Sequence, residues 1–450
     1  MERLTSGDLL PGIETPPPGP RSRALIEGLR RYESPNITYI STDFPIFWKE
    51  ARGANVLDVD GNVYVDLTGG FAVAVAGHRN EAVLSAMQRQ MDLLVHGLGD
   101  VHPPDVKVEL LRRLAEITPA GLDRAILASS GAEAVEAALK TARLASGRPG
   151  VLRFSGGYHG LTYGALCVTD GDQFRAPFSD QLGIPTVRVP YPDPYRTPEK
   201  LRGAADLAGA AIELVRSRLD ESADEIGAVI IEPIQGRAGV IVPPPGFLSR
   251  LREECDRRAL VLIFDEIYTG FGRTGRWFAC EHENVVPDLL CVGKALTGAL
   301  PLSACVGRAS IMEAWPPSGG EAIHTSTFLG HPLGCAAALA QIDEIERLDL
   351  VARAERLGVR LINHLRQAMR RHPEIGDVRG RGLMIGIELV NPASGEPHAG
   401  AAKRLLVEAL RRGVLLLASR GTITLTPPLT ISEPQLDFAL QTIEACLRPS

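Results

Sequence analysis

Two stretches decide the fold of this chain, Val261-Leu-Ile-Phe-Asp265 and Leu289-Leu-Cys-Val-Gly-Lys294. Each is a short apolar run that ends in a charged residue. An uninterrupted apolar run of this length is typical of a strand that is buried on both faces of a parallel sheet. Because ligands of open α/β sheets bind beyond the carboxyl ends of the strands, we expect Asp265 and Lys294 to meet at one binding edge.

A buried amine and a buried carboxylate at one sheet edge are what a pyridoxal phosphate enzyme needs. The lysine forms a Schiff base with the cofactor, and the carboxylate faces the protonated ring nitrogen. Asp265 should stay ionised beside that positive charge. Lys294, once freed, would transfer the substrate proton, which requires a lowered pKa. We therefore expect pyridoxal phosphate chemistry at these two residues.

The composition is that of an ordinary globular protein. The chain has 450 residues, of which 45% are hydrophobic and 23% charged, and this length is sufficient for two domains. A formal net charge of −6 argues against a nucleic-acid partner. No apolar run reaches membrane-spanning length, and neither the seven cysteines nor the ten histidines have metal-ligand spacing. We expect a cytoplasmic protein that binds no metal.

Apolar runs and amphipathic stretches alternate through the middle of the chain. This alternation predicts a mostly parallel sheet with helices on both faces, in an α/β domain over residues 76–333. The expected strands lie near 125–128, 150–154, 186–189, 227–232, 260–265, 289–292 and 302–306, and the expected helices lie at 80–95, 104–117, 131–146, 199–219 and 246–259.

The two ends of the chain follow other patterns. Residues 1–35 include the Pro-rich run 11–20, which holds neither a helix nor a strand ladder, so we expect an arm that packs on a partner subunit. A hairpin is predicted over 47–66, with its turn at Asp60-Gly61-Asn62. Residues 36–75 and 334–450 should form a smaller α+β domain, with helices at 334–347, 350–371, 400–412 and 433–446 and strands near 382–390, 414–417 and 422–425.

A phosphate group has a candidate site at the start of the predicted helix 131–146. Ser130, Gly131 and Ala132 stand between a strand end and this helix, where free main-chain N–H groups attract an anion. An ordinary capped helix is the alternative. We favour phosphate binding because of the chemistry expected at the neighbouring strand ends.

Other polar residues also follow predicted strands. Tyr158 and His159 lie on a Gly-rich loop, where an aromatic ring could stack on a pyridine ring; a buried aromatic beside a hydrogen-bonded histidine is the alternative. Glu232 ends another apolar run and could orient a polar group or shift the pKa of the Lys294 amine. Thr327 is a candidate second phosphate donor, and a simple hydroxyl turn is its alternative.

One motif points to a different cofactor. Gly270-Phe-Gly-Arg-Thr-Gly275 matches the dinucleotide-binding fingerprint and follows a predicted strand. The residues after it do not open a helix, and no βαβ unit closes within about thirty residues, as that fingerprint requires. We therefore interpret the motif as a loop over the cofactor and do not expect nicotinamide binding.

Together these motifs resemble the class III aminotransferases, of the fold type I pyridoxal phosphate superfamily. The resemblance runs from about Phe47 to Ile443 and includes Gly157-Tyr-His-Gly160, Ile231-Glu-Pro-Ile-Gln-Gly236 and Pro427-Pro-Leu-Thr-Ile431. It implies a large domain with a mostly parallel sheet and a smaller α+β domain. It also implies a homodimer with shared sites, in which Thr327 reaches the cofactor of the neighbouring subunit; pairing of dimers into tetramers is left open.

The resemblance also implies roles for individual residues. Lys294 would be the Schiff-base lysine, Asp265 would contact the ring nitrogen, and Tyr158 would stack on the ring. Phosphate contacts would come from Ser130, Gly131 and Ala132.

Three positions depart from the family pattern. Leu161 stands where members that handle ω-amino acids often have an arginine, and Thr424 stands where many have another. Tyr268 replaces the glutamine that commonly contacts the phenolic oxygen of the cofactor. Losing both arginines removes two bidentate carboxylate forks, so we expect a substrate pocket that is more apolar and less selective for anions.

Several phrases are most similar to the aminolactam racemase and amino-acid 2-epimerase branch of the class. Those racemases carry an aspartate, a second proton-transfer group, at the position of Arg237. An arginine cannot accept a proton but could hold a carboxylate. We therefore expect a ping-pong aminotransferase that moves an amino group from a small-molecule donor, an amino acid or amine, to a carbonyl acceptor, a keto acid, ketone or aldehyde. A racemase is the alternative, a decarboxylating relative a weaker one, and a non-catalytic cofactor-binding protein weaker still.

Overall fold

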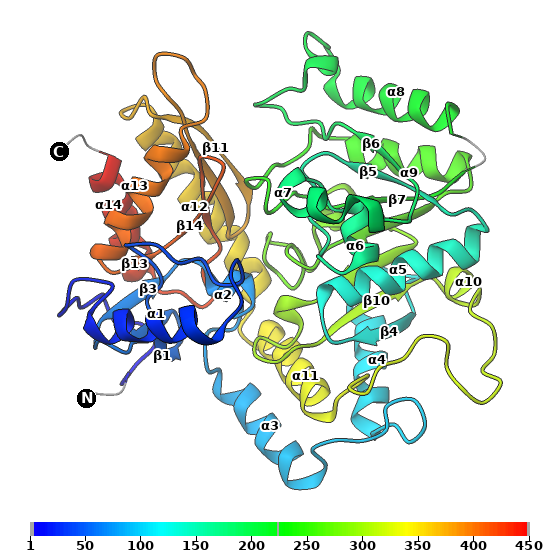
Figure 1. Ribbon diagram of the computed structural model, residues 1–450, viewed down its shortest axis with the longest axis horizontal. Coiled ribbons are helices and arrows are strands. Elements are labelled where there is room, and N and C mark those ends of the chain that lie inside the picture. The colour runs from blue at the N-terminus through cyan, green and yellow to red at the C-terminus, as the bar shows by residue number, and fades with distance from the viewer. Residues whose placement is uncertain (1–3, 223–224, 448–450) are drawn as a thin grey trace.

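The computed structural model describes residues 4–222 and 225–447, which form a larger and a smaller part side by side (Figure 1). The larger part is built on a seven-stranded sheet with the order β4-β10-β9-β8-β7-β5-β6. Among these strands β10 alone runs in the direction opposite to the other six, which confirms the predicted α/β class with a mostly parallel sheet. The strands are β4 (Arg124–Ala128), β5 (Gly150–Phe154), β6 (Thr186–Val189), β7 (Ile226–Ile231), β8 (Val261–Asp265), β9 (Leu289–Val292) and β10 (Ser303–Gly307).

Helices cover both faces of this sheet, and this explains the uninterrupted apolar runs. Ile263 and Leu289 pack with residues of α5 (Gly131–Ser146), whereas Leu262 and Phe264 pack in the core that includes α8 (Leu207–Asp220) and α9 (Phe247–Arg257). Successive side chains of a strand point to opposite faces, so a strand with two covered faces must be apolar at every position.

The smaller part draws on both ends of the chain. Its first sheet has the order β1-β2-β3-β13, and β13 pairs in parallel with β3. These strands are β1 (Trp48–Arg52), β2 (Asn55–Asp58), β3 (Val63–Asp66) and β13 (Val414–Leu415). Its second sheet, β11-β12-β15-β14, consists of β11 (Ile375–Arg381), β12 (Met384–Leu389), β15 (Thr422–Leu425) and β14 (Leu417–Ser419).

Most of the remaining helices connect or cover these sheets. α3 (Glu81–Leu93) and α4 (Asp105–Ile117) both pack against α11 (Pro332–Arg347). The smaller part also holds α12 (Leu350–Met369), α13 (Ala399–Arg411) and α14 (Glu433–Leu447). No helix within the described residues is long and apolar enough to span a membrane.

The N-terminal segment differs from the irregular arm that we expected. It contains α1 (Pro20–Tyr32), because Pro20 occupies the first turn of the helix, where its missing N–H is not needed. Asp60 accepts hydrogen bonds from the main-chain N–H groups of Arg21 (2.8 Å) and Ser22 (3.0 Å) at the start of this helix. The segment therefore packs on the hairpin of its own chain.

Two other elements also differ from expectation. The predicted helix 199–219 is a short 3₁₀ turn (Glu199–Leu201) followed by α8, whose N-terminus is capped by Asp206 accepting from Gly209 N at 3.0 Å. β11 was not predicted, because only two of its seven side chains, Ile375 and Val378, are buried. A strand with so few buried positions has no clear apolar pattern.

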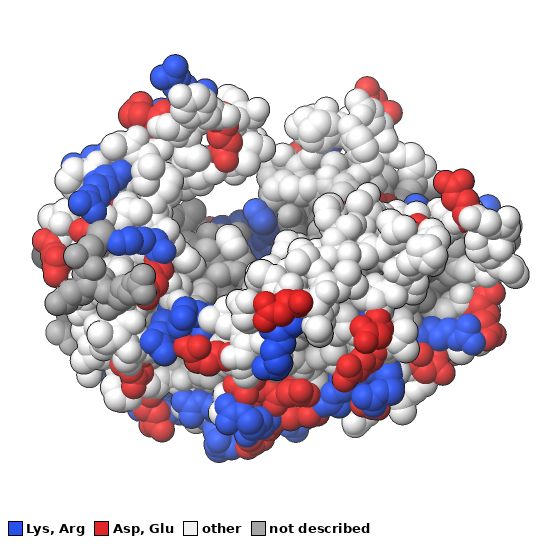
Figure 2. Space-filling view, turned by 90° about the horizontal axis from the view of Figure 1, so that it is seen from below, with Lys and Arg blue, Asp and Glu red and all other residues white. Residues whose placement is uncertain are grey.

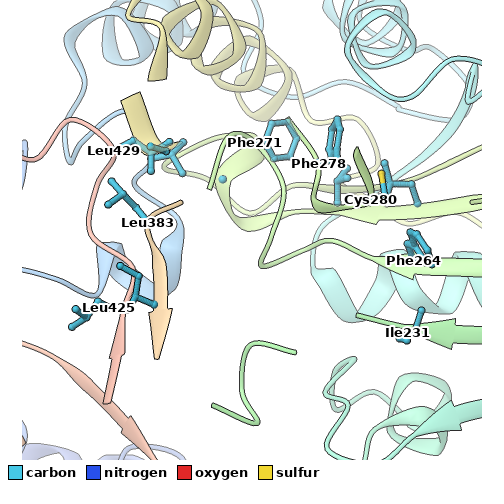
Figure 3. Packing of buried hydrophobic residues seen from close by; sticks show 14 of the residues in the cluster. Ile231, Phe264, Phe271, Phe278, Cys280, Leu383, Leu425 and Leu429 are labelled. Atoms are coloured by element: carbon cyan, nitrogen blue, oxygen red, sulfur yellow. The ribbon is translucent and has the colours of Figure 1, made fainter. Parts of the chain in front are cut away.

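One apolar core runs from the large sheet into the smaller part (Figure 3). Phe264 lies on β8, and Phe271 and Phe278 pack edge to face in the loop beyond it, with ring centroids 5.6 Å apart. Leu383 and Leu429 of the smaller part are fully buried in the same core. Figure 2 shows that the surface between the two parts is hollowed and that charged side chains of both signs mix along the outer rim.

Candidate active site

Three charged side chains lie at the carboxyl ends of neighbouring strands. Glu232 follows β7, Asp265 ends β8, and Lys294 follows β9. β8 pairs in parallel with both β7 and β9, and Asp265 lies opposite Cys291 in the sheet. The sheet thus brings an amine and two carboxylates to one edge, although they are distant in sequence.

Asp265 is held by a histidine from the loop after β5. His159 Nδ1 lies 2.8 Å from Asp265 Oδ2, and both side chains are buried. An ionised carboxylate can only accept, so His159 Nδ1 carries the hydrogen in this pair. The main-chain N–H of His159 donates to Thr169 Oγ1 at 2.9 Å, which fixes the backbone that carries the imidazole ring. The remaining oxygen, Oδ1, accepts from Ile267 N at 3.1 Å.

Glu232 joins two loops of the site through its two carboxylate oxygens. Oε1 accepts from Tyr158 N and Oε2 accepts from Gly236 N, both at 2.9 Å. Burial raises the pKa of Glu232 to about 7, although His159 and these two N–H groups act in the opposite direction. This carboxyl therefore titrates near neutral pH in the folded chain.

Lys294 lies in a conformation that few side chains adopt. Its φ is 41°, in the left-handed region, and such strain in a non-glycine residue is typical of functional sites. The amine Nζ lies 4.4 Å from the centre of the Tyr268 ring. Burial lowers the pKa of this amine, Asp265 and Glu232 act to raise it, and Arg237 acts to lower it. Lys294 therefore has the lowered pKa that we expected of a proton-transfer base.

The start of α5 offers unpaired donors near these strand ends. Ser130 caps the helix, with its Oγ accepting from Glu133 N at 3.3 Å. The first N–H groups of an α-helix have no partner within the helix, and none within the described chain is recorded for Gly131 or Ala132. A Cβ on Gly131 would lie 2.8 Å from Ile267 Cδ1, so this close approach requires glycine.

Tyr158 is part of an aromatic cluster. The guanidinium of Arg237 lies 4.6 Å from the centre of the Tyr158 ring and 5.1 Å from that of Phe174. Tyr158 and Phe174 themselves meet edge to face at 5.7 Å. Arg237 thus covers part of the Tyr158 ring, and stacking of this ring on the cofactor stays a prediction.

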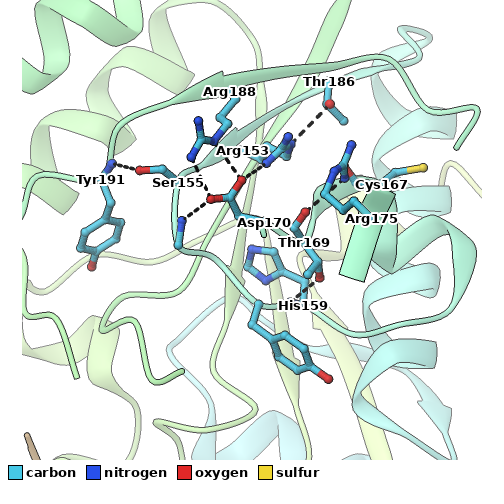
Figure 4. A network of polar contacts seen from close by, with 12 residues as sticks. Arg153, Ser155, His159, Cys167, Thr169, Asp170, Arg175, Thr186, Arg188 and Tyr191 are labelled. Carbon is cyan, nitrogen blue, oxygen red and sulfur yellow. Dashed lines mark hydrogen bonds and ion pairs between the residues drawn. The ribbon is translucent and has the colours of Figure 1, made fainter. Parts of the chain in front are cut away.

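A polar network fixes the loop that carries Tyr158 and His159 (Figure 4). Asp170 closes this loop by accepting from Gly156 N at 2.8 Å and from Arg153 Nη1 at 2.9 Å. It also binds Arg188 through Nε at 2.9 Å and Nη2 at 3.0 Å. Burial acts to raise the pKa of Asp170, but the Gly156 N–H and the two guanidinium groups outweigh it and lower the pKa to about 2.

The other predicted residues lie at the margins of the site. Leu161 is exposed, and Thr424 is buried on β15. Thr424 shares a strand face with Thr422, whose hydroxyl lies against Gly239. Thr327 is exposed in a loop that contacts α5 through His324 and Lys140, 3.2 Å apart.

Two contributors to the site were missed by our reading of the sequence. Ile267 packs against Gly131 and Gly293, between the start of α5 and the strand end before Lys294. Asp170 holds the Tyr158 loop through Gly156, which lies fourteen residues earlier in the chain. Ile267 could have been noticed as an apolar residue directly after the acidic pair 265–266, whereas Asp170 has no local signal.

These residues fit pyridoxal phosphate. The Lys294 amine, with its lowered pKa, could bind the aldehyde carbon of the cofactor, and the buried Asp265 carboxylate, held by His159, could bind its protonated ring nitrogen. The free N–H groups at the start of α5 could bind its phosphate. Among the described residues, no group of three or more potential metal ligands comes together.

The sequence matches known proteins along most of its length. The family model "Aminotransferase class-III" matches residues 38–447. The chain belongs to the class III aminotransferases. Acetylornithine aminotransferase of Methanopyrus kandleri is 39% identical to this aminotransferase over 90% of this chain and 95% of that protein. A leucine/methionine racemase of Thermococcus litoralis is 36% identical over 95% of this chain and 96% of that protein.

The fold of this aminotransferase matches solved structures equally well. An amine transaminase from an uncultivated Pseudomonas species superposes with a TM-score of 0.87 at 32% identity, over 93% of this chain and 98% of that one. That transaminase was crystallised with pyridoxal phosphate bound. The predicted family, fold type I architecture, enzyme class and pyridoxal phosphate cofactor are therefore confirmed.

Proposed function

We propose that this aminotransferase takes an amino group from an amino acid or amine and passes it to a keto acid, ketone or aldehyde, with Lys294 moving the proton. The position of the Lys294 amine carries this proposal. It lies over the Tyr268 ring at the end of the strand next to Asp265, and burial lowers its pKa. A lowered pKa makes the neutral amine, which is the form that accepts a proton, more available.

The remaining roles follow from the contacts of each group. When bound, pyridoxal phosphate takes up the electrons of the broken substrate bond and carries the amino group between the half-reactions. We propose that Lys294 holds it as a Schiff base, and that Asp265, oriented by His159, faces its ring nitrogen. The phosphate would lie against Ser130, Gly131 and Ala132, and Glu232 would align the Tyr158 loop and support the Lys294 amine.

Transamination is favoured over racemisation by the side chain at position 237. A racemase must return the proton to either face of the substrate carbon, which requires a second proton acceptor, whereas transamination can proceed with the lysine alone. Arg237 cannot accept a proton. The similarity to a leucine/methionine racemase makes this the alternative to test.

A half-reaction in deuterated water separates the two activities. The enzyme, loaded with cofactor and given no carbonyl acceptor, is mixed in turn with L- and D-amino acids, simple amines and an aminolactam. Transamination predicts conversion of the cofactor to its amine form with one equivalent of carbonyl product. If the cofactor spectrum is unchanged and deuterium enters the α-carbon of both enantiomers, the enzyme is a racemase.

We propose that the enzyme is a homodimer in which Thr327 completes the partner's phosphate site. Exposed apolar side chains gather in the segment between α3 and α4, where they would be costly to leave in water. They are Leu93, Leu94, Val95, Leu98 and Val101, and Phe328 next to Thr327 is also exposed. Size-exclusion chromatography with light scattering tests the dimer, and a weaker cofactor affinity of Thr327→Val tests its contribution.

We further propose that the enzyme acts in the cytoplasm on small-molecule donors and acceptors. All seven cysteines are free thiols, and six of them are buried. Unpaired cysteines of this kind are typical of a reducing compartment. Fractionation of cells that express the native chain tests this location.

A further inference from the structure

Arg237 is an exposed cation, and the described residues offer its side chain no polar partner. Its guanidinium stacks near the rings of Tyr158 and Phe174, at 4.6 and 5.1 Å. Within residues 4–222 and 225–447, the structure records no hydrogen bond and no ion pair of this side chain. Stacking occupies the faces of a planar guanidinium and leaves the N–H donors at its edge free. The free edge has the geometry that binds a carboxylate with two parallel hydrogen bonds.

The loop that carries Arg237 is held from several sides. Gln235 and Ile241 exchange main-chain hydrogen bonds of 2.9 and 3.0 Å, which close the loop at its base. Gly236 N donates to Glu232 at 2.9 Å, and Arg379 Nε donates to the Gly239 carbonyl at 3.0 Å. A Cβ on Gly236 would lie 2.0 Å from Tyr268 Cδ1, so the loop also packs tightly on that ring. Such a backbone positions the Arg237 side chain before any ligand arrives.

The positive charge of Arg237 acts on two groups of the site. Its charge acts to lower the pKa of the Lys294 amine and acts in the same direction on the Tyr268 hydroxyl, whose pKa burial raises. The guanidinium therefore lies within electrostatic range of the amine that would move the substrate proton. A carboxylate bound at its edge would lie in the part of the site that holds the Tyr158 ring.

Two other positions near the site carry no positive charge. Leu161 is apolar and exposed beyond the Tyr158 loop, and Thr424 is a neutral side chain on β15. A substrate carboxylate therefore finds no cation at either of them. Arg237, on the Tyr158 side of the site, is left to supply one.

We propose that Arg237 binds the carboxylate of the amino donor, so that the enzyme prefers amino acids to amines that lack a carboxylate. The inference rests on the proposed function of the site and adds the substrate class. It adds one anion-binding group to the pocket that we expected, from Leu161 and Thr424, to be more apolar and less selective for anions.

The test compares matched donors in wild type, Arg237→Met and Arg237→Lys. The half-reaction is followed by cofactor absorbance with L-leucine and with 3-methylbutylamine, which differ only in the carboxylate, and with L-phenylalanine and 2-phenylethylamine. Loss of a hydrogen-bonded charge pair should lower kcat/KM for the amino acid, relative to the amine, by about 10- to 100-fold in Arg237→Met. We call the kcat/KM for the amino acid divided by that for the matched amine the donor ratio. Arg237→Lys should recover part of the donor ratio, because an ammonium keeps the charge but not the planar fork of the guanidinium.

A second readout does not depend on turnover. Binding of 4-methylpentanoate, a carboxylate without an amino group, is measured by titration calorimetry with the loaded enzyme and again without cofactor. We expect Arg237→Met to weaken it by about tenfold or more. Arg31→Met is the matched control, because Arg31 also stacks on a ring, Tyr32, at 5.1 Å in α1, away from the site. This control should keep both the donor ratio and the affinity of wild type.

The outcomes separate this inference from the proposed function. An unchanged donor ratio with unchanged carboxylate affinity in Arg237→Met overturns the inference, and so does a wild type that does not bind 4-methylpentanoate. Equal losses with amino acid and amine also overturn it, because Arg237 would then act only through the packing of Tyr158. If deuterium exchange reveals a racemase while carboxylate affinity still depends on Arg237, the proposed function fails and the inference stands.

Discussion

Replacing Asp170 with Asn should loosen the loop that presents Tyr158 and His159. The carboxylate of Asp170 accepts from Gly156 N, Arg153 and Arg188, and its side chain is only 11% exposed. These contacts lower its pKa from 3.8 to about 2 despite burial, and one pKa unit corresponds to about 1.4 kcal/mol. Ionised Asp170 therefore contributes about 2 kcal/mol to the free energy of unfolding at neutral pH.

The pH dependence has a definite sign. The pKa of Asp170 is lower in the folded chain, so its contribution is complete above pH 4 and is lost as the pH falls toward 2. The stability difference between wild type and Asp170→Asn should therefore be constant from pH 5 to 8. Asp170→Asn also leaves the buried Arg153 without its carboxylate, so about 2 kcal/mol is a lower estimate.

Urea unfolding of the cofactor-free protein, followed by tryptophan fluorescence, measures this difference. Glu313→Gln is the control, because its ion pair with Arg124 is exposed on both sides and should change stability by less than about 1 kcal/mol. Cofactor release, followed by absorbance, should be faster in Asp170→Asn because the loop contacts the site through His159. Equal stability of the two variants, or a difference that grows between pH 5 and 8, would refute this reasoning.

Three further substitutions test the groups at the strand ends. Lys294→Ala should abolish the visible absorbance of the covalently bound cofactor together with turnover, and a retained band with full turnover would contradict its role. Asp265→Asn should slow the half-reaction by about 10- to 100-fold, as expected for loss of a charge-assisted hydrogen bond, measured by stopped-flow absorbance. Burial raises the pKa of Glu232 from 4.5 to about 7, so between these two pH values the folded chain holds a proton that the unfolded chain has lost. The free energy of unfolding should therefore fall by about 3 kcal/mol as the pH rises through this range. Urea unfolding between pH 4.5 and 7.5 should show this fall in wild type but not in Glu232→Gln.

Local patterns predicted the large sheet correctly. The stretch Val261–Asp265 is apolar up to its last residue, which indicates a strand that is buried on both faces and ends in a polar group. Both features depend only on residues that are neighbours in the sequence. The cofactor could be inferred for the same reason, because the chemistry of Lys294 and Asp265 requires only that their strands be adjacent and parallel. α1 and β11 were missed, since a helix that begins at Pro20 and a strand with two buried side chains have weak local patterns.

The order of residues alone therefore determined the α/β class and the cofactor, and it predicted that Asp265 and Lys294 meet at one sheet edge, because strand periodicity and the residues that end each strand depend on local sequence. Tertiary packing alone decided which distant groups meet. His159 and Asp265 are 106 residues apart, and Arg237 reaches the Tyr158 ring from another strand end. A pattern reveals that a polar group will be buried, but the packing of whole elements decides which partner it meets. That packing placed the Arg237 guanidinium against the Tyr158 ring, where none of the described residues gives it a polar partner.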